Sequence, residues 1–227
     1  MAKKCKERRC DMSQAVPPLK SSREGNDPPR VTLAKLRAIA AVGVTPVERS
    51  LHLARRQAEM LLDAHPVDTG MIPAEVITEL RGIRVEWVPG QRLPSAGFWD
   101  TAARQWVIQL AYADSWKQQR WALAREFKHI LDYPHADDLY PSTDATSSRY
   151  LAEQAADHFA DHLLVPDRLL RRAWSNDIGT AAELSVHFSV PEFVTERRLV
   201  DTPLGLDTGR ARRHRAADVA GPDGGAA

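Results

Sequence analysis

The sequence is poor in several features, and each scarcity excludes a class of protein. It has two cysteines in 227 residues, Cys5 and Cys10, too few for a disulfide framework or a four-cysteine zinc site. No hydrophobic run approaches the roughly 20 residues that a membrane-spanning helix needs. The amino terminus also lacks the apolar stretch of a secretory signal. We therefore expect a cytoplasmic protein with no membrane association.

Net charge is almost absent as well, because 31 Lys and Arg residues offset 30 Asp and Glu residues. The charges are nevertheless unevenly placed. Residues 1–30 carry eight basic and four acidic side chains, residues 208–227 carry four and two, and the body carries 19 and 24. Because large apolar residues are scarce at both ends, we expect disordered basic tails on either side of a single acidic domain at 31–207.

The pattern of the body predicts helices, then a small sheet, then more helices. Thr45 to Glu48 and Thr180 to Glu183 have the spacing of capping boxes, as does the pair Ser189 and Glu192. The expected elements are helices near 32–42, 45–64, 73–80, 115–133 and 148–164, two short carboxyl-terminal helices, and strands near 83–87, 96–99 and 106–110. This order predicts an α+β fold, a mainly helical single domain with a small antiparallel β-meander.

The long helix near 115–133 contains the sequence Arg125-Glu126-Phe127-Lys128-His129. Residues four apart share a helix face, so Arg125 and His129 project together, with Asp132 one turn further on. In the zinc-peptidase pattern H-E-x-x-H, two histidines bind the metal and the glutamate accepts a proton from bound water. A guanidinium has no free lone pair, so Arg125 cannot replace the first histidine as a ligand.

The next helix carries a more specific pattern, Glu153-Gln-Ala-Ala-Asp157-His-Phe-Ala-Asp-His-Leu-Leu-Val-Pro166. Taken with the preceding helix, it resembles the ImmA/IrrE metallopeptidase family, in which H-E-x-x-H is followed by E-x-x-A-(N/D)-x-F-A-x-x-L-L-x-P. The resemblance covers roughly residues 50–205 and implies a zincin-like pair of active-site helices. It departs from the family at Arg125.

The resemblance also implies a function. It makes His129 and Glu153 zinc ligands, Glu126 the general base, and the protein a zinc-dependent endopeptidase acting on a transcriptional regulator such as a repressor. Asp157 shares the Glu153 face and could support a ligand. Asp132 or His135 could serve as a substitute for the missing ligand.

Two other functions remain open. Arg125 could pair with Glu153 in place of the metal, which would leave a catalytically inactive protein-binding or regulatory module on the same scaffold. The basic tails and the last two helices could instead belong to a DNA-associated regulator. Glutamates in the final helix disfavour groove binding, so we expect this pair to pack against the body. We also expect His158 and His162 to be exposed and the six tryptophans to lie in the core.

Overall fold

The computed structural model describes residues 32–68, 70–142 and 147–202. Both basic tails and the two cysteines, Cys5 and Cys10, lie outside these residues. The expected domain limits at 31 and 207 also lie outside them. None of the helices in the described residues is long and apolar enough to cross a membrane.

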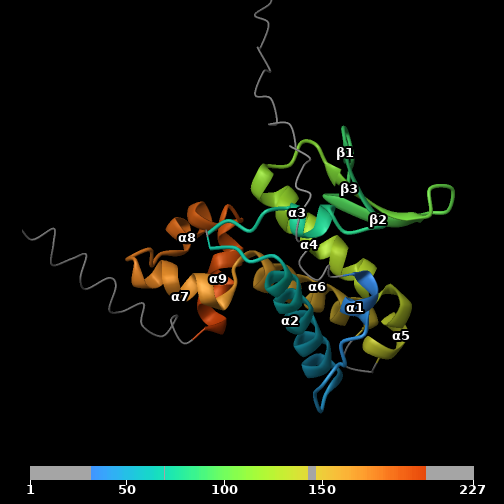
Figure 1. The fold of residues 1–227 in the computed structure, drawn as a ribbon, viewed down its shortest axis with the longest axis horizontal. Helices are drawn as coiled ribbons and strands as arrows, with labels where there is room; N and C mark the ends of the chain where they lie inside the picture. Colours follow the sequence, from blue (N-terminus) through green and yellow to red (C-terminus); the bar gives the residue numbers. More distant parts are fainter. Residues whose placement is uncertain (1–31, 69, 143–146, 203–227) are drawn as a thin grey trace, which may run out of the picture.

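The described residues form an α+β fold that is mainly helical, as expected (Figure 1). In chain order the elements are α1 (Leu33–Arg37), α2 (Pro46–Ala64), α3 (Glu75–Thr78), β1 (Ile83–Val88), β2 (Ser95–Asp100), β3 (Gln105–Ala111), α4 (Trp116–Asp132), the 3-10 turn η1 (Tyr133–His135), α5 (Ala136–Leu139), α6 (Ser148–Leu164), α7 (Asp167–Ser175), α8 (Ala181–Phe188) and α9 (Glu192–Asp201). The sequence pattern did not predict η1, α5 or α7, and α1 ends five residues earlier than expected.

Helix starts were predicted well where a capping box is present. At α2 the Thr45 hydroxyl accepts from the Glu48 N–H at 3.2 Å, and the Glu48 carboxylate accepts from the Thr45 N–H at 3.0 Å. The box at Thr180 is also confirmed. The one expected at Ser189 is wrong, because Ser189 has a left-handed conformation (φ 52°) that ends α8, and Pro191 is the N-cap of α9.

The three strands do not form the expected antiparallel meander. Their order is β1-β3-β2, with β1 parallel to β3 and β2 antiparallel to it. β3 is the most buried strand and lies in the centre, so the chain passes from β1 to the far edge before it returns. Alternating apolar residues identify a half-buried strand but carry no information about its neighbour, which is why the meander was wrong.

Helix α4 connects the sheet with the helical part of the molecule (Figure 1). One side of α4 contacts β2 and β3, and another side packs on α6, which in turn packs on α2. At the α4–α6 contact the rings of Phe127 and Phe159, both fully buried, have centroids 6.0 Å apart. This contact lies in one continuous hydrophobic core that also includes residues of α2, α7, α8 and α9.

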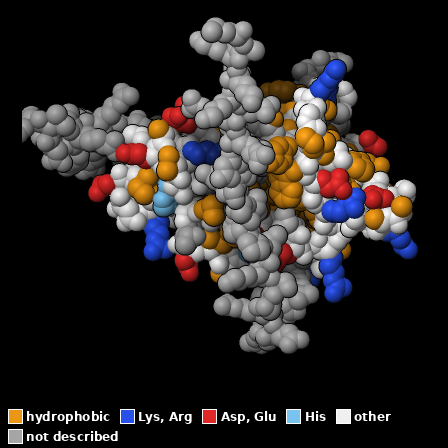
Figure 2. Space-filling model, turned by 90° about the horizontal axis from the view of Figure 1, so that it is seen from above, with side chains coloured by type: hydrophobic (Ala, Val, Ile, Leu, Met, Phe, Trp, Pro, Cys, Tyr) orange, Lys and Arg blue, Asp and Glu red, His pale blue; other side chains and the backbone are white. Residues whose placement is uncertain are grey.

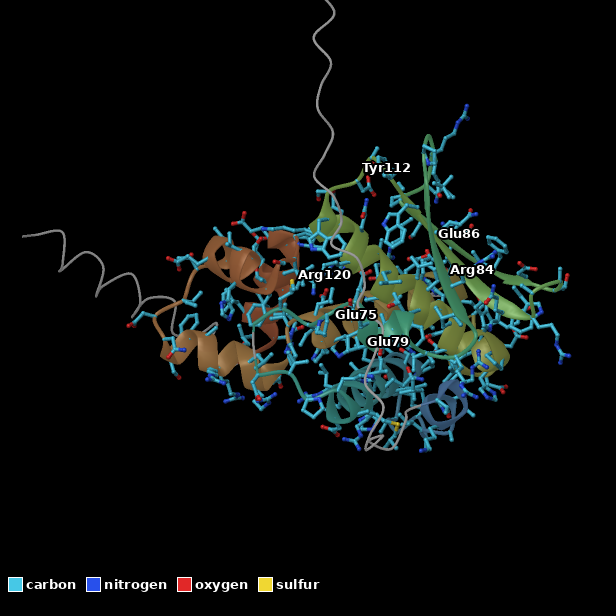
Figure 3. All side chains as sticks on the ribbon, turned by 45° about the horizontal axis from the view of Figure 1, so that its top comes forward. Glu75, Glu79, Arg84, Glu86, Tyr112 and Arg120 are labelled. Carbon is cyan, nitrogen blue, oxygen red and sulfur yellow. The ribbon has the colours of Figure 1, made fainter. Side chains whose placement is uncertain are left out.

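A buried arginine fixes the carboxyl-terminal helices against α4. The Arg120 side chain is 3% exposed and lies among the helices in Figure 3. One of its nitrogens donates to the Phe188 carbonyl at 2.9 Å and to the Ser189 carbonyl, and the other donates to the Ile72 carbonyl. Burial lowers the pKa of Arg120 to about 10, so the side chain remains charged at neutral pH.

Three of the six tryptophans were wrongly expected in the core. Trp87, Trp99 and Trp116 are 49%, 45% and 54% exposed. Seven of the 14 exposed large hydrophobic residues among the described residues belong to the sheet or adjoin it, namely Trp87, Leu93, Phe98, Trp99, Tyr112, Trp116 and Tyr133. Figure 2 shows hydrophobic side chains gathered on the face seen from above, where the sheet lies in Figure 1. The sheet and its neighbouring segments therefore carry half of the exposed large hydrophobic residues in the described part of the chain.

Candidate functional site

Helices α4 and α6 bring the residues of the two sequence motifs together. Arg125, Glu126 and His129 project from α4, and Glu153 and Asp157 project from the first half of α6. Ala124 of α4 and Ala160 of α6 are small, fully buried residues of the core that the two helices share.

Arg125 binds two carboxylates of α6 at once. One terminal nitrogen of its guanidinium donates to Glu153, and its Nε donates to Asp157 Oδ1 at 2.6 Å. The guanidinium carbon also lies 4.6 Å from the centre of the Trp121 ring, a cation–π contact. The Arg125 side chain is 20% exposed, so these ion pairs are partly shielded from water. The pairing of Arg125 with Glu153 that the sequence allowed is therefore present.

His129 lies beside this ion pair and does not form a hydrogen bond with it. Its Nε2 is 3.9 Å from Glu153 Oε2, beyond hydrogen-bond distance. The same Glu153 oxygen accepts from Arg125. Arg125 therefore binds the same carboxylate oxygen of Glu153 that lies nearest to His129.

Glu126 points to the sheet. Its Oε1 accepts from the Ser95 hydroxyl at 2.8 Å, and its Oε2 would lie 3.0 Å from a Cβ added at Gly97. Because that spacing is tight for any side chain, the glycine leaves room for the carboxylate. Among the described residues, Glu126 has no basic partner.

The residues present do not fit a zinc ion. His129 and Glu153 are near each other, but no group of three or more His, Cys, Asp or Glu side chains within the described ranges could hold a metal. The position where the family has another histidine carries Arg125, which has no lone pair to offer and neutralises Glu153.

The two possible substitute ligands have other surroundings. The Asp132 carboxylate is 3% exposed and accepts from Lys128 Nζ at 2.6 Å and from the Tyr140 hydroxyl. Burial lowers the pKa of Lys128, whereas the charge of Asp132 opposes that shift. His135 is exposed and lies in η1, past the end of α4. Asp132 therefore belongs to a separate buried cluster with Lys128 and Tyr140.

Asp157 connects the site to a residue that no sequence motif pointed to. Its second oxygen pairs with Arg197 of α9 at 3.1 Å, and Arg197 also binds Asp161 through two nitrogens, at 2.7 and 2.9 Å. Arg197 also lies 5.7 Å from the Trp121 ring centre and 5.0 Å from that of Phe193. We call this series of five alternating charges, Glu153–Arg125–Asp157–Arg197–Asp161, the ion-pair ladder.

Burial and charge act in opposite directions on the far end of the ladder. Burial raises the pKa of Asp161, although Arg197 opposes the shift. Burial also tends to lower the pKa of Arg197, but the hydrogen bonds and charges of Asp161 and Asp157 outweigh it and raise the pKa. Arg197 is therefore fixed as a cation. The spacing of Glu153, Asp157 and Asp161 on one face of α6 was the available signal for this arrangement, but it could not identify the basic partner.

His158 and His162 are not the exposed residues we expected. His162 is 7% exposed, and the two rings have centroids 4.0 Å apart. His162 Nε2 lies 3.1 Å from a nitrogen of the buried Arg198, which also binds Asp167. Burial is the main cause that lowers the pKa of His158 to about 4 and that of His162 to about 3. Both rings are therefore neutral at physiological pH.

The final two helices pack on the body, as expected. Two arginines of α9 show this most clearly, because Arg197 binds α6 and Arg198 is buried. Arg197 pairs with Asp157 and Asp161 of α6, and Arg198 pairs with Asp167 of α7.

Comparison with known proteins identifies the family. The family model described as the IrrE N-terminal-like domain, Peptidase_M78, matches residues 80–200, which is more than half of the chain. The chain belongs to this family, and the resemblance seen in the motifs of α4 and α6 is confirmed.

A solved structure of a Mycobacterium tuberculosis transcriptional regulator is similar at 18% identity, with a TM-score of 0.49. The match covers 69% of this chain and 52% of the regulator, so the chain spans about half the length of that protein. Curated proteins gave no match.

Proposed function

We propose that this chain is a metal-independent regulatory module that binds a protein partner on an IrrE-like peptidase scaffold, and that the partner is a transcriptional regulator. The observation that carries the proposal is the double pairing of Arg125 with Glu153 and Asp157. A fixed cation repels a divalent metal and already satisfies the carboxylate that zinc would need. The scaffold and its exposed apolar side remain available for a partner.

Zinc content tests this proposal directly. We expect protein purified with zinc in the medium to contain far less than one zinc per chain by elemental analysis. In Arg125→His, a histidine joins His129 and Glu153, so zinc uptake should approach one per chain. One tightly bound zinc in the unaltered protein, lost in His129→Ala, would overturn the proposal.

That contrary result would support the family's peptidase activity instead. The retained Glu126, His129 and Glu153 stand at the positions of the base and two ligands in the family pattern. Incubation of the protein with a candidate regulator, with and without a chelator, distinguishes the two functions. Cleavage that the chelator abolishes belongs to a peptidase, whereas stable binding without cleavage belongs to the proposed module.

A further inference from the structure

Strand β1 forms one free edge of the sheet. Within the described residues it pairs with β3 on one side and has no strand on the other. The Gly82 carbonyl accepts from the Trp106 N–H at 2.7 Å, and the Val88 carbonyl accepts from the Tyr112 N–H at 3.1 Å. Because the direction of the backbone groups alternates along a strand, the even-numbered residues of β1 point these groups towards β3.

The odd-numbered residues of β1 therefore present their backbone groups at the free edge. The carbonyl of Ile83 and both backbone groups of Val85 and Trp87 point away from β3. The Ile83 N–H points the same way and donates to the Leu80 carbonyl at 3.2 Å in the turn before the strand. A row of edge groups of this kind is a template for pairing with another strand.

The side chains of β1 are complementary to those of a second β1 strand. Arg84 and Glu86 project from one face of the strand (Figure 3), and both are partly exposed. Ile83, Val85 and Trp87 project from the other face, and Trp87 is 49% exposed. In an antiparallel pair of two β1 strands centred on Val85, Arg84 of each copy lies opposite Glu86 of the other. Ile83 then lies opposite Trp87, and the two copies of Val85 lie opposite each other.

The charges select one register for such a pair. A shift by two residues places Arg84 opposite Arg84, or Glu86 opposite Glu86, and like charges directly opposite each other destabilise a sheet. A shift by one residue sets outward backbone groups of one strand against inward groups of the other. The register centred on Val85 therefore aligns both the backbone groups and the opposite charges.

The other free edge, β2, is less suited to a second copy. Glu126 approaches the middle of β2, where its Oε2 would lie 3.0 Å from a Cβ added at Gly97. Two copies paired through β2 would bring their Glu126 carboxylates towards each other, and like charges repel. The only charged residue of β2 is Asp100, so no cross-strand pair of opposite charges offsets this repulsion.

We propose that two copies of this chain associate through an antiparallel pair of β1 strands, which joins their three-stranded sheets into one. In each copy β2 and the neighbouring Glu126 lie at the opposite edge of the sheet, so both candidate sites stay accessible. Two sites in one assembly raise the avidity for a partner that is itself a dimer. The inference goes beyond the proposed function and does not depend on it.

Sedimentation velocity of the full chain tests the association. One pair of short strands buries less than the roughly 1,200 Å² of a standard interface, so we expect a dimer at about 100 μM chain that dissociates at about 1 μM. Arg84→Glu and Glu86→Arg each place like charges opposite each other, so each should raise the dissociation constant at least about tenfold. Arg56→Glu makes the same charge change on the exposed side of α2 and should leave the constant unchanged.

A mixture of the two β1 variants makes the outcome decisive. When Arg84→Glu pairs with Glu86→Arg, every cross-strand charge again faces one of opposite sign. The mixture should therefore dimerise about as tightly as the unaltered protein, although neither variant does so alone. A monomer at the higher concentration, single variants that associate as tightly as the unaltered protein, or a mixture that stays monomeric each overturn the inference. Circular dichroism of each variant reports folding, and the zinc content of the same samples reports separately on the proposed function.

Discussion

Arg125 changes the chemistry of the site in two ways, because it adds hydrogen-bond donors and removes a metal-binding lone pair. A histidine at this position would present a lone pair, whereas the guanidinium presents only donors. Two of those donors are aimed at Glu153 and Asp157, and the flat face of the group lies on Trp121. The Arg125 guanidinium therefore neutralises two carboxylates of α6.

Removal of Arg125 should destabilise the protein. In Arg125→Ala, two half-buried carboxylates lose their main partner, so we expect the free energy of unfolding to fall by about 1–3 kcal/mol. Urea denaturation followed by circular dichroism measures it. Arg56→Ala is the matched control, because Arg56 pairs with Glu59 on the exposed side of α2, and such pairs contribute about 0–1 kcal/mol. Equal losses in the two variants would contradict a structural role for Arg125.

At the scale of elements, the ion-pair ladder connects three helices. The carboxylates come from one face of α6, and the two arginines come from α4 and α9. Trp121 of α4 joins the same contact, since its indole N–H donates to Asp161 at 3.3 Å and its ring packs edge-on against Phe193. We therefore expect a change at Arg125 to affect the position of α9.

A double-mutant cycle measures this connection. Because Arg125 and Arg197 share Asp157, we expect the losses in Arg125→Ala and Arg197→Ala to be non-additive by more than about 0.5 kcal/mol. Arg37→Ala combined with Arg125→Ala is the control, since Arg37 binds carbonyls at the end of α4 and shares no partner with Arg125. Additive losses in the first pair, as in the second, would show that α9 is positioned independently.

The buried histidines predict a loss of stability in acid. Their pKa values are lowered in the folded protein, to about 4 for His158 and about 3 for His162, from a usual value of 6.5. The unfolded chain therefore binds more protons below pH 6.5. Each histidine should lower the free energy of unfolding by up to about 1.4 kcal/mol per pH unit as the pH falls from about 6.5 to about 4.

Urea denaturation at several pH values checks this expectation. His162→Gln removes one titrating group and should reduce the slope of unfolding free energy against pH. His52→Gln, at an exposed position on α2, should leave the slope unchanged. A slope in His162→Gln equal to that of the unaltered protein would show that His162 does not cause the acid sensitivity.

At the scale of the whole molecule, the described elements share one continuous hydrophobic core, and the ion-pair ladder connects three of the helices around it. Residues of most helices and of two strands contribute to that one core. On the proposed metal-independent function, we expect a chelator to leave the thermal midpoint of the unaltered protein unchanged, because a metal adds to stability only where it binds the folded chain. Differential scanning calorimetry is the measurement. Arg125→His loaded with zinc should lose several degrees on chelation, and the same loss in the unaltered protein would indicate a resident metal.

Local chemistry determined much of the helical structure from the sequence alone. The capping boxes at Thr45 and Thr180 and the limits of α6 depend on residues within a few positions of each other, so the sequence contains all that is needed to predict them. The motif of α6 likewise indicated the family, and Arg125 at a ligand position indicated that zinc chemistry was in question. The site roles expected for Glu126, His129 and Glu153 stay predictions.

Only the tertiary structure decided which distant residues meet. The parallel pairing of β1 with β3, the binding of Arg197 to α6 and the burial of His162 all join segments more than 15 residues apart. Hydrophobic periodicity predicts which face of a strand or helix a residue occupies, but it does not predict whether another element covers that face. Trp99 therefore remains 45% exposed, although the pattern placed it in the core. The sequence alone thus showed that Arg125 occupies the position of a metal ligand in the family pattern. The packing of α4 on α6 then brought it into contact with Glu153 and Asp157.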